Sequence, residues 1–382
     1  MSLAGAADLR KPVVLLLAPS LGAISGVSTH VNVLLGSALV RDFELEHFQV
    51  GSEGRVESAL GRVARLAFGP FQLAAAILRR GAAVVHVNTS LVPRSYWRDL
   101  ANVAVAKLCG ARVAYQVHGG AAPESFFAHP LLKGFFRATL RLPDVLVVLG
   151  TTQLEAYRAF VPGTNIAAIP NGIDFRRPDR SPNANGPLRL LYIGRLAPRK
   201  GLGETLAALA TARSSGLAAR LVIVGAGPEE PLLRQLVNDY GVQDAVTFAG
   251  PAFGEEEKKR LADADVLVLA SYAEGLPYAL LEAMAAGVVP VVTPVGAMAD
   301  VVQHGVHGIF VPVGDAGAIA AAIHELSCER EKLARMSAAC CERVAARYSA
   351  ERLAEDFGAL YRALVGGSAA RADAPTRRSR FT

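Results

Sequence analysis

The chain has 382 residues, of which 52% are apolar and 19% are charged, and its formal net charge is +6. This length favours two domains of ordinary size, each with enough apolar residues for its own core. Its apolar runs are far shorter than the ~20 residues that a membrane-spanning helix needs. The first residues also lack the apolar centre of a secretory signal, and the four cysteines have neither a disulfide nor a metal-binding spacing. We therefore expect a cytoplasmic protein.

The positive charge is concentrated in the first half of the chain. Residues 1–182 have a net charge of +7, whereas residues 183–367 have a net charge of −4. A basic first half suits an anionic partner or an anionic membrane face. RNA-binding charge would be spread more evenly, so we expect no nucleic-acid partner.

Short β-rich runs alternate with longer helical stretches, a pattern typical of βαβ units and parallel sheets. In the first half we predict strands at 13–18, 84–87, 112–117 and 145–149. Helices are predicted between them, from about 27, near 98–108 and near 131–140. In the second half we predict strands at 189–193, 220–224, 245–249, 266–269 and 288–292. The helices between them are predicted at 202–214, 229–240, 255–263 and 277–286.

The same alternation occurs on both sides of a linker-like stretch at 177–187. We therefore predict an α/β protein with one Rossmann-like domain over 1–180 and a second over 181–349, facing each other across a deep cleft. A helix near 350–365 is expected to pack back on the first domain, and the basic tail 368–382 is expected to be disordered. Ligands of such sheets bind at the carboxyl ends of the strands.

Two cations follow the first strand of the second half, in the segment YIGRLAPRKG. Arg195 and Lys200 lie in the loop between this strand and a helix that opens after Gly201. Two cations beside the exposed amides of a helix N-terminus suit a diphosphate. A solvated basic loop is the alternative interpretation.

A pair of glutamates lies in SYAEGLPYALLEAMAAG, where a strand ends and a helix begins. Glu274 precedes the helix, whereas Glu282 lies within it among apolar residues, where a surface glutamate is unexpected. Carboxylates can accept hydrogen bonds from two hydroxyls of a sugar or ribose. The backbone between them would line a phosphate site, formed by Gly275, Leu276, Pro277 and Tyr278. The alternative is that Glu274 caps the helix and Glu282 lies at the surface.

Two further positions of the first half follow predicted strands. Gly26 opens a helix and allows the backbone to approach a phosphate closely, but the spacing does not satisfy the dinucleotide fingerprint G-x-G-x-x-G. His118 precedes two glycines, and we assign it to the site because loop histidines at a strand end often contact ligands. His86, within a strand, is predicted to be packed in the core.

Asp263 and Asp265 form the sequence Asp-x-Asp, but they lie between a helix and a strand, and we predict a structural role. Two basic, apolar segments, 61–80 and 129–143, fit either helices at an anionic membrane surface or ordinary domain helices with basic outer faces. The sequence leaves both interpretations open.

The combination of GRLAPRKG, PNGID at 170–174 and the pair Glu274 and Glu282 resembles the retaining glycosyltransferase family 4, of the GT-B fold. The resemblance runs from the first strand to about Tyr361. It implies that Glu282 holds the ribose of the donor, that Glu274 holds hydroxyls of the transferred sugar, and that Arg195 and Lys200 neutralise the diphosphate. His118 would contact the sugar or the reacting centre, and Gly26 the donor. One departure is Ser25, which stands where the family has the first glycine of a pair.

The resemblance implies sugar transfer from a UDP-, GDP- or ADP-sugar to a glycan or lipid-linked acceptor, without a metal ion or other cofactor. Cell-envelope or exopolysaccharide assembly, at the inner face of the cytoplasmic membrane, is the expected setting. A sugar-nucleotide epimerase or a phosphorylase of the same architecture would bind similar ligands. A non-catalytic sugar-binding protein is a further alternative, although it would have no use for the cations at Arg195 and Lys200.

Overall fold

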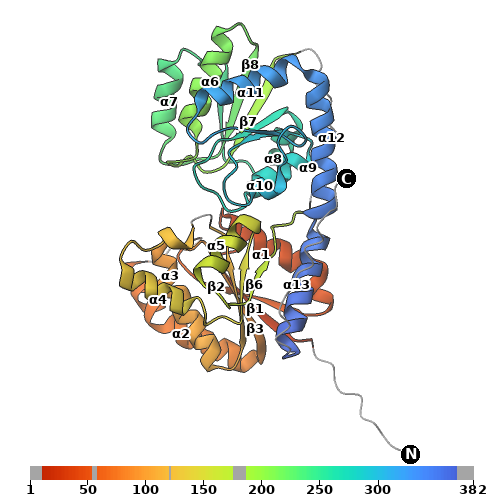
Figure 1. Ribbon diagram of the computed structural model, residues 1–382. Helices are drawn as coiled ribbons and strands as arrows, with labels where there is room; N and C mark the ends of the chain where they lie inside the picture. Colours follow the sequence, from red (N-terminus) through yellow and green to blue (C-terminus); the bar gives the residue numbers. More distant parts are fainter. Residues whose placement is uncertain (1–10, 54–57, 120–121, 175–185, 368–382) are drawn as a thin grey trace, which may run out of the picture. The chain divides into compact units, whose positions relative to one another are not determined.

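The computed structural model describes residues 11–53, 58–119, 122–174 and 186–367 (Figure 1). The chain divides into two compact units. Unit 1 comprises Met1–Pro170 and Ala350–Thr382, and unit 2 comprises Asn171–Ser349. Most of the expected linker and the tail 368–382 lie outside the described residues.

Unit 1 contains a six-stranded parallel sheet with the strand order β2-β1-β3-β4-β5-β6. Its inner strands are apolar along most of their length because helices cover both faces of the sheet. The strands are β1 (Val13–Ala18), β2 (Glu44–Gln49), β3 (Ala82–Thr89), β4 (Arg112–Val117), β5 (Val145–Val148) and β6 (Ile166–Ala168).

The helices of unit 1 form one layer on each face of this sheet (Figure 1). One face packs against α1 (Gly26–Gly36) and the last helix, α13 (Ala350–Val365). The other face packs against the remaining helices, which are α2 (Ala59–Arg80), α3 (Pro93–Leu108), α4 (Pro130–Thr139) and α5 (Thr151–Phe160). Two short 3-10 turns, at Ala38–Arg41 and Pro123–Ser125, complete the unit.

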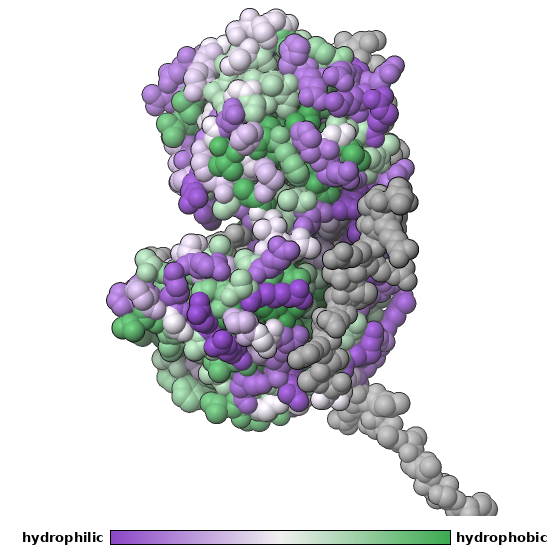
Figure 2. All heavy atoms as spheres, in the orientation of Figure 1, coloured by the Kyte–Doolittle hydropathy of each residue, from purple (hydrophilic) through white to green (hydrophobic). Residues whose placement is uncertain are grey.

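The outer surface of α2, α3 and α4 is partly apolar. Figure 2 shows apolar atoms at the left tip and lower edge of unit 1, where these helices lie in Figure 1. None of the described helices is long and apolar enough to cross a membrane.

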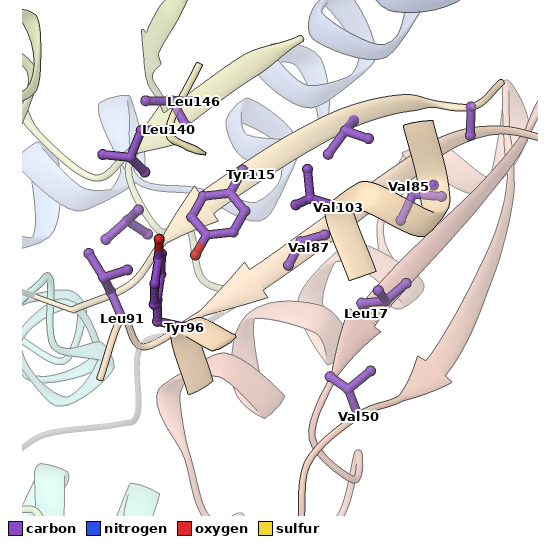
Figure 3. Packing of buried hydrophobic residues seen from close by; sticks show 14 of the residues in the cluster. Leu17, Val50, Val85, Val87, Leu91, Tyr96, Val103, Tyr115, Leu140 and Leu146 are labelled. Carbon is purple, nitrogen blue, oxygen red and sulfur yellow. The ribbon is translucent and has the colours of Figure 1, made fainter. Parts of the chain in front are cut away.

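The core beneath α3 is built from aromatic and branched side chains. Figure 3 shows the rings of Tyr96 and Tyr115 beside Leu91 and Val87, in a cluster that is shielded from solvent. The other face of the sheet is closed by α13, whose Phe357 is fully buried. The Tyr361 hydroxyl lies 2.7 Å from Nδ1 of His86. Unit 1 therefore includes residues from both ends of the described chain.

Unit 2 contains a second six-stranded parallel sheet, with the strand order β12-β11-β10-β7-β8-β9. The order reverses between β7 and β10, so the loops after these two strands lead to opposite sides of the sheet and leave a binding position at their carboxyl ends. The strands are β7 (Leu188–Ile193), β8 (Ala219–Val224), β9 (Val246–Gly250), β10 (Val266–Leu269), β11 (Val289–Val292) and β12 (Ile309–Phe310).

The helices of unit 2 cover its sheet and bury its apolar residues. Helix α6 packs against α7 and α11, and α9 packs against α12. The helices are α6 (Leu202–Ser214), α7 (Glu230–Asp239), α8 (Glu255–Ala262), α9 (Tyr278–Ala285), α10 (Met298–Val301), α11 (Ala316–Cys328) and α12 (Arg330–Arg347).

The predicted α/β architecture with two Rossmann-like sheets is confirmed, and every predicted strand is present. Three strands were missed, namely β2, β6 and β12. The edge strand β2 has the sequence ELEHFQ and is only partly buried, so it lacks the apolar run that identified the others. The strands β6 and β12 are only 3 and 2 residues long, too short for a periodic signal. The prediction also missed α5, α10, α11 and α12, whereas α13 lies where a helix near 350–365 was expected.

Candidate functional site

Two of the predicted residues of unit 2 meet at the reversal of strand order. The loop after β7 holds Lys200, and the loop after β10 holds Glu274. Nζ of Lys200 lies 2.6 Å from Oε1 of Glu274, and the Ser271 hydroxyl donates to the same oxygen at 2.8 Å. The side chains are 29% exposed for Lys200 and 13% exposed for Glu274, so the pair is shielded but reachable.

Close packing of the backbone brings these two loops together. Gly201, which caps α6, has a φ of +72°, and a Cβ at this position would collide with the carbonyl group of Ala270 at the end of β10. The Tyr272 amide also donates to the Arg199 carbonyl at 2.9 Å. Only glycine can occupy position 201 without moving the Lys200 loop away from Glu274.

The segment between Glu274 and α9 is held from two sides. The Ala297 amide donates to the Gly275 carbonyl at 2.8 Å, and Nδ2 of Asn171 donates to the Leu276 carbonyl at 2.8 Å. Pro277 caps the helix, so α9 starts at the buried Tyr278. The first amides of a helix have no partner within it, and they are therefore available for an anion.

Arg195 has an exposed side chain that makes no hydrogen bond or ion pair with the described residues. Its backbone is fixed, because the buried Tyr192 hydroxyl donates to the Arg195 carbonyl at 3.0 Å. The backbone of Arg195 is therefore held in place, and its guanidinium group is available to a ligand.

Glu282 lies on the second turn of α9 and has an unusual protonation equilibrium. Burial, and to a lesser degree the nearby carboxylate of Glu257, raises the pKa of Glu282 to about 8. Among the residues that the structure describes, no side chain forms a salt bridge or hydrogen bond with its carboxyl group. At neutral pH this carboxyl is largely protonated, so it can both donate and accept a hydrogen bond. That capacity suits a pair of adjacent hydroxyls.

Gly26 and His118, the predicted residues of the first half, lie in unit 1, whereas the others lie in unit 2. Gly26 is the first residue of α1, and Ser25 caps this helix through a hydrogen bond that its hydroxyl accepts from the Ser28 amide at 3.2 Å. The departure from the Gly-Gly pair therefore has a structural role, since serine is a favoured N-cap residue.

His118 belongs to a cluster of three histidines. Its ring centroid lies 4.7 Å from that of His30, and the centroids of His30 and His86 lie 6.3 Å apart. Burial, together with the neighbouring His30 and His86, lowers the pKa of His118 well below its usual value. The pKa of His86 is lowered to about 3, mainly by burial, which agrees with the prediction that it is packed in the core.

The tautomer of His118 follows from its partner. Nε2 lies 2.9 Å from Oδ1 of Asn88, and an amide oxygen only accepts, so Nε2 carries the proton. The neutral ring then has Nδ1 as a hydrogen-bond acceptor. His30 and Asn88 were missed by the sequence analysis, because each lies in a regular element with no motif around it.

Asp265 has the structural role that its position predicted. Its carboxylate accepts hydrogen bonds from Nε and Nη2 of Arg189 at 3.0 and 2.8 Å, and it is buried. Asp263 caps the end of α8. Among the residues that the structure describes, no three or more His, Cys, Asp or Glu side chains form a group that could hold a metal ion.

The chain is similar in sequence to known proteins. The family model for glycosyl transferases group 1 matches residues 175–342. The chain is similar to the GDP-mannose-dependent alpha-(1-6)-phosphatidylinositol monomannoside mannosyltransferase of Mycobacterium tuberculosis. The two are 33% identical over 285 residues, which cover 70% of this chain and 73% of the relative.

Two solved structures resemble the fold. One is the sucrose-phosphate synthase of Thermosynechococcus elongatus, with a TM-score of 0.75 and 21% identity, covering 94% of this chain and 100% of that one. The other is Anabaena HepE in complex with UDP-glucose, with a TM-score of 0.72 and 18% identity, covering 91% of this chain and 98% of that one. These structures support the GT-B fold of two Rossmann-like domains.

The packing at Gly201 leads to a first prediction. Gly201→Ala should destabilise the protein by at least about 2 kcal/mol more than Gly216→Ala. Both glycines have positive φ, but a Cβ at Gly216 meets no atom within 4 Å, so this control isolates the collision with Ala270. Urea unfolding followed by circular dichroism gives the difference. Equal destabilisation by the two substitutions would contradict the role of this contact.

The raised pKa of Glu282 leads to a second prediction. A carboxyl whose pKa is higher in the folded state contributes most stability at low pH and loses it as the pH rises through about 8. Glu282→Gln removes this dependence. The variant should therefore gain stability relative to the wild type between pH 5 and pH 9, on the order of a few kcal/mol.

Melting temperatures of the two proteins at several pH values measure this change. The matched control is Glu331→Gln, which removes an exposed carboxylate of unit 2 that has no salt bridge or hydrogen bond with the described residues. It should shift the melting temperature equally at every pH. If Glu282→Gln also shifted the melting temperature equally at every pH, the prediction of a raised pKa for Glu282 would be wrong.

Proposed function

We propose that this chain, which belongs to the glycosyl transferases group 1, transfers a sugar from a nucleoside-diphosphate sugar to an acceptor hydroxyl with retention of anomeric configuration. The acceptor belongs to a cell-envelope or exopolysaccharide glycan. The 33% sequence identity with the mycobacterial phosphatidylinositol monomannoside mannosyltransferase supports this setting.

The observation that carries the proposal is the contact between Lys200 and Glu274 at the reversal of strand order. It places a cation and a carboxylate 2.6 Å apart where the loops after β7 and β10 meet. The cation suits the diphosphate, and the carboxylate suits the hydroxyls of the sugar attached to it. A nucleoside-diphosphate sugar presents these two groups next to each other, so one ligand can contact both residues.

The leaving diphosphate gains negative charge as the glycosidic bond breaks. We assign its stabilisation to Arg195 and Lys200, together with the amides at the start of α6 and α9. The two cations supply the charge that a divalent metal supplies elsewhere, and we therefore propose a metal-independent reaction that needs no other cofactor. Glu282 binds the ribose through its largely protonated carboxyl. His118 offers Nδ1 as an acceptor for a sugar hydroxyl.

The basic, partly apolar face of unit 1 supports a peripheral position at an anionic membrane. On α2, the side chains of Leu60, Val63, Phe71 and Leu78 are 79%, 62%, 72% and 67% exposed. At 3.6 residues per turn these four fall within an arc of roughly 80°. Helix α4 exposes Leu131 in the same way, at 79%. Exposed apolar stripes with basic neighbours are typical of helices that lie in a membrane interface.

The donor site is tested by calorimetric titration with UDP, GDP and ADP in the presence of a metal chelator. One nucleotide should bind, and Arg195→Gln should weaken its binding about 10- to 100-fold, because charge-assisted hydrogen bonds contribute about 1.5–3 kcal/mol. Glu282→Ala should also weaken it.

The matched control for this titration is Arg220→Gln. Arg220 is an exposed arginine at the amino-terminal end of β8, on the edge of the sheet opposite the site. Its substitution should leave the affinity unchanged. If no nucleotide bound with chelator, but one bound with added magnesium, metal independence would be wrong. If none bound under either condition, the donor site would be wrong.

The membrane position is tested by flotation with vesicles of phosphatidylglycerol and phosphatidylcholine. The protein should float at low salt and be released as the salt concentration rises. The double variant with Phe71→Asp and Leu78→Asp should remain at the bottom of the gradient. Leu232→Asp, at a 52% exposed leucine of unit 2, should float like the wild type. Absence of flotation with the wild type would overturn this position.

A further inference from the structure

A cavity of about 390 Å³ lies in unit 1, apart from the residues assigned to the donor. It is bounded by the end of β2, by α2 between Gly61 and Gln72, and by the middle of α3. This volume is within the range of sites for small molecules. Its walls combine apolar side chains, such as Phe48 and Phe68, with two arginines, Arg65 and Arg98.

Arg98 is held in place by two neighbours, Asp99 and Gly51. Its Nε donates to Oδ1 of Asp99 at 2.8 Å, and the side chain of Asp99 is fully buried. A Cβ at Gly51, where φ is +79°, would lie within 4 Å of Nη1 and Cζ of Arg98, so the guanidinium lies directly against this glycine. Arg98 itself is 22% exposed and lines the cavity. The guanidinium has five N–H donors, and Asp99 uses only part of them.

Asn102 provides an independent indication of a ligand. It lines the cavity and is 6% exposed, yet its Nδ2 donates to no acceptor among the described residues. Leaving a buried amide group without an acceptor costs about 1–3 kcal/mol. An acceptor oxygen bound beside Arg98 would remove this cost.

Apolar surface adjoins the cavity on its outer side. Phe68 lines the cavity and is 61% exposed, and it lies on α2 next to the stripe formed by Leu60, Val63, Phe71 and Leu78. The site therefore has a basic, amide-lined interior and an apolar rim. A ligand that fits both parts has an anionic, oxygen-rich head and an apolar chain.

We propose that this cavity binds the phosphate-bearing headgroup of a membrane lipid, which serves as the acceptor or carries it. Arg65, Arg98 and Asn102 contact the phosphate oxygens, and the lipid chains lie along the stripe of α2. This assignment rests on the proposed transferase function, and it names the chemical class of the acceptor. It concerns unit 1 alone, so it can fail while the donor site stands.

The test uses calorimetric titration with dihexanoylglycerol phosphate below its micelle concentration. Two further ligands separate its parts: glycerol phosphate has only the head, and dihexanoylglycerol has only the chains. The complete lipid phosphate should bind at least tenfold more tightly than either part. If glycerol phosphate bound equally well, the cavity would be a site for a soluble phosphate, which would overturn the lipid assignment. Absence of binding by the complete lipid phosphate would overturn it as well.

Substitutions then locate the binding. Ala64 is exposed and lines the cavity, so Ala64→Trp should fill it and weaken binding at least tenfold. Asn102→Leu should weaken it as well. Ala104→Trp introduces the same side chain at an exposed position of α3 outside the cavity lining, and binding should be retained. Unchanged binding in both Ala64→Trp and Asn102→Leu would place the lipid elsewhere.

Nucleotide titration of the same variants separates the two proposals. Ala64→Trp should bind the donor nucleotide like the wild type, because Arg195, Lys200 and Glu282, which we assign to the nucleotide, are in unit 2. If the wild type bound no nucleotide, the donor site would be overturned, but the proposal for the cavity would not be affected. Circular dichroism of each variant establishes that it is folded.

Discussion

The backbone contact between the loop after β7 and the end of β10 is the constraint on which the rest of the site depends. Gly201 lies so close to Ala270 that no side chain fits between them. This contact brings Lys200 within 2.6 Å of Glu274, although the two are 74 residues apart in the sequence. It also starts α6 at the same edge of the sheet where α9 starts after Pro277. Cation, carboxylate and helix amides are therefore positioned before any ligand arrives, which is the requirement for electrostatic stabilisation of a leaving group.

Unit 1 depends on a different kind of contact, between its first strands and the last helix of the described chain. Phe357 and Tyr361 of α13 pack against His86 and close one face of the sheet. The same histidine lies beside His30, which contacts His118. The chain must therefore complete unit 2 and return to unit 1 before the surroundings of His118 are complete. Burial in this cluster keeps the ring neutral, and Asn88 determines which nitrogen is the acceptor.

The two units have different chemistry. Unit 2 combines charged groups with backbone amides at the reversal of strand order, as a sugar nucleotide requires. Unit 1 exposes apolar residues on α2 and encloses Arg98 and Asn102 in a cavity beside them. The net charge of +8 in unit 1, residues 1–170 and 350–382, agrees with this division, because an anionic amphiphile interacts with both the basic and the apolar groups. The proposed donor and acceptor sites are thus assigned to separate parts of the sequence.

The sequence by itself predicted most of the strands and the loops that hold the candidate donor residues. Strands such as β10 are buried on both faces and therefore appear as continuous apolar runs, and the loops that follow them must lie at one edge of a parallel sheet. Arg195, Lys200 and Glu274 could be placed in these loops on that basis, and Glu282 was identified by its apolar neighbours in the following helix. Only the tertiary structure decided the partners of these residues and the buried groups around them. The raised pKa of Glu282, the cluster around His118 and the cavity at Arg98 each arise from residues that are distant in the sequence. Contacts between distant segments leave no periodic pattern along the chain, and so no local signal could reveal the neighbours of these groups.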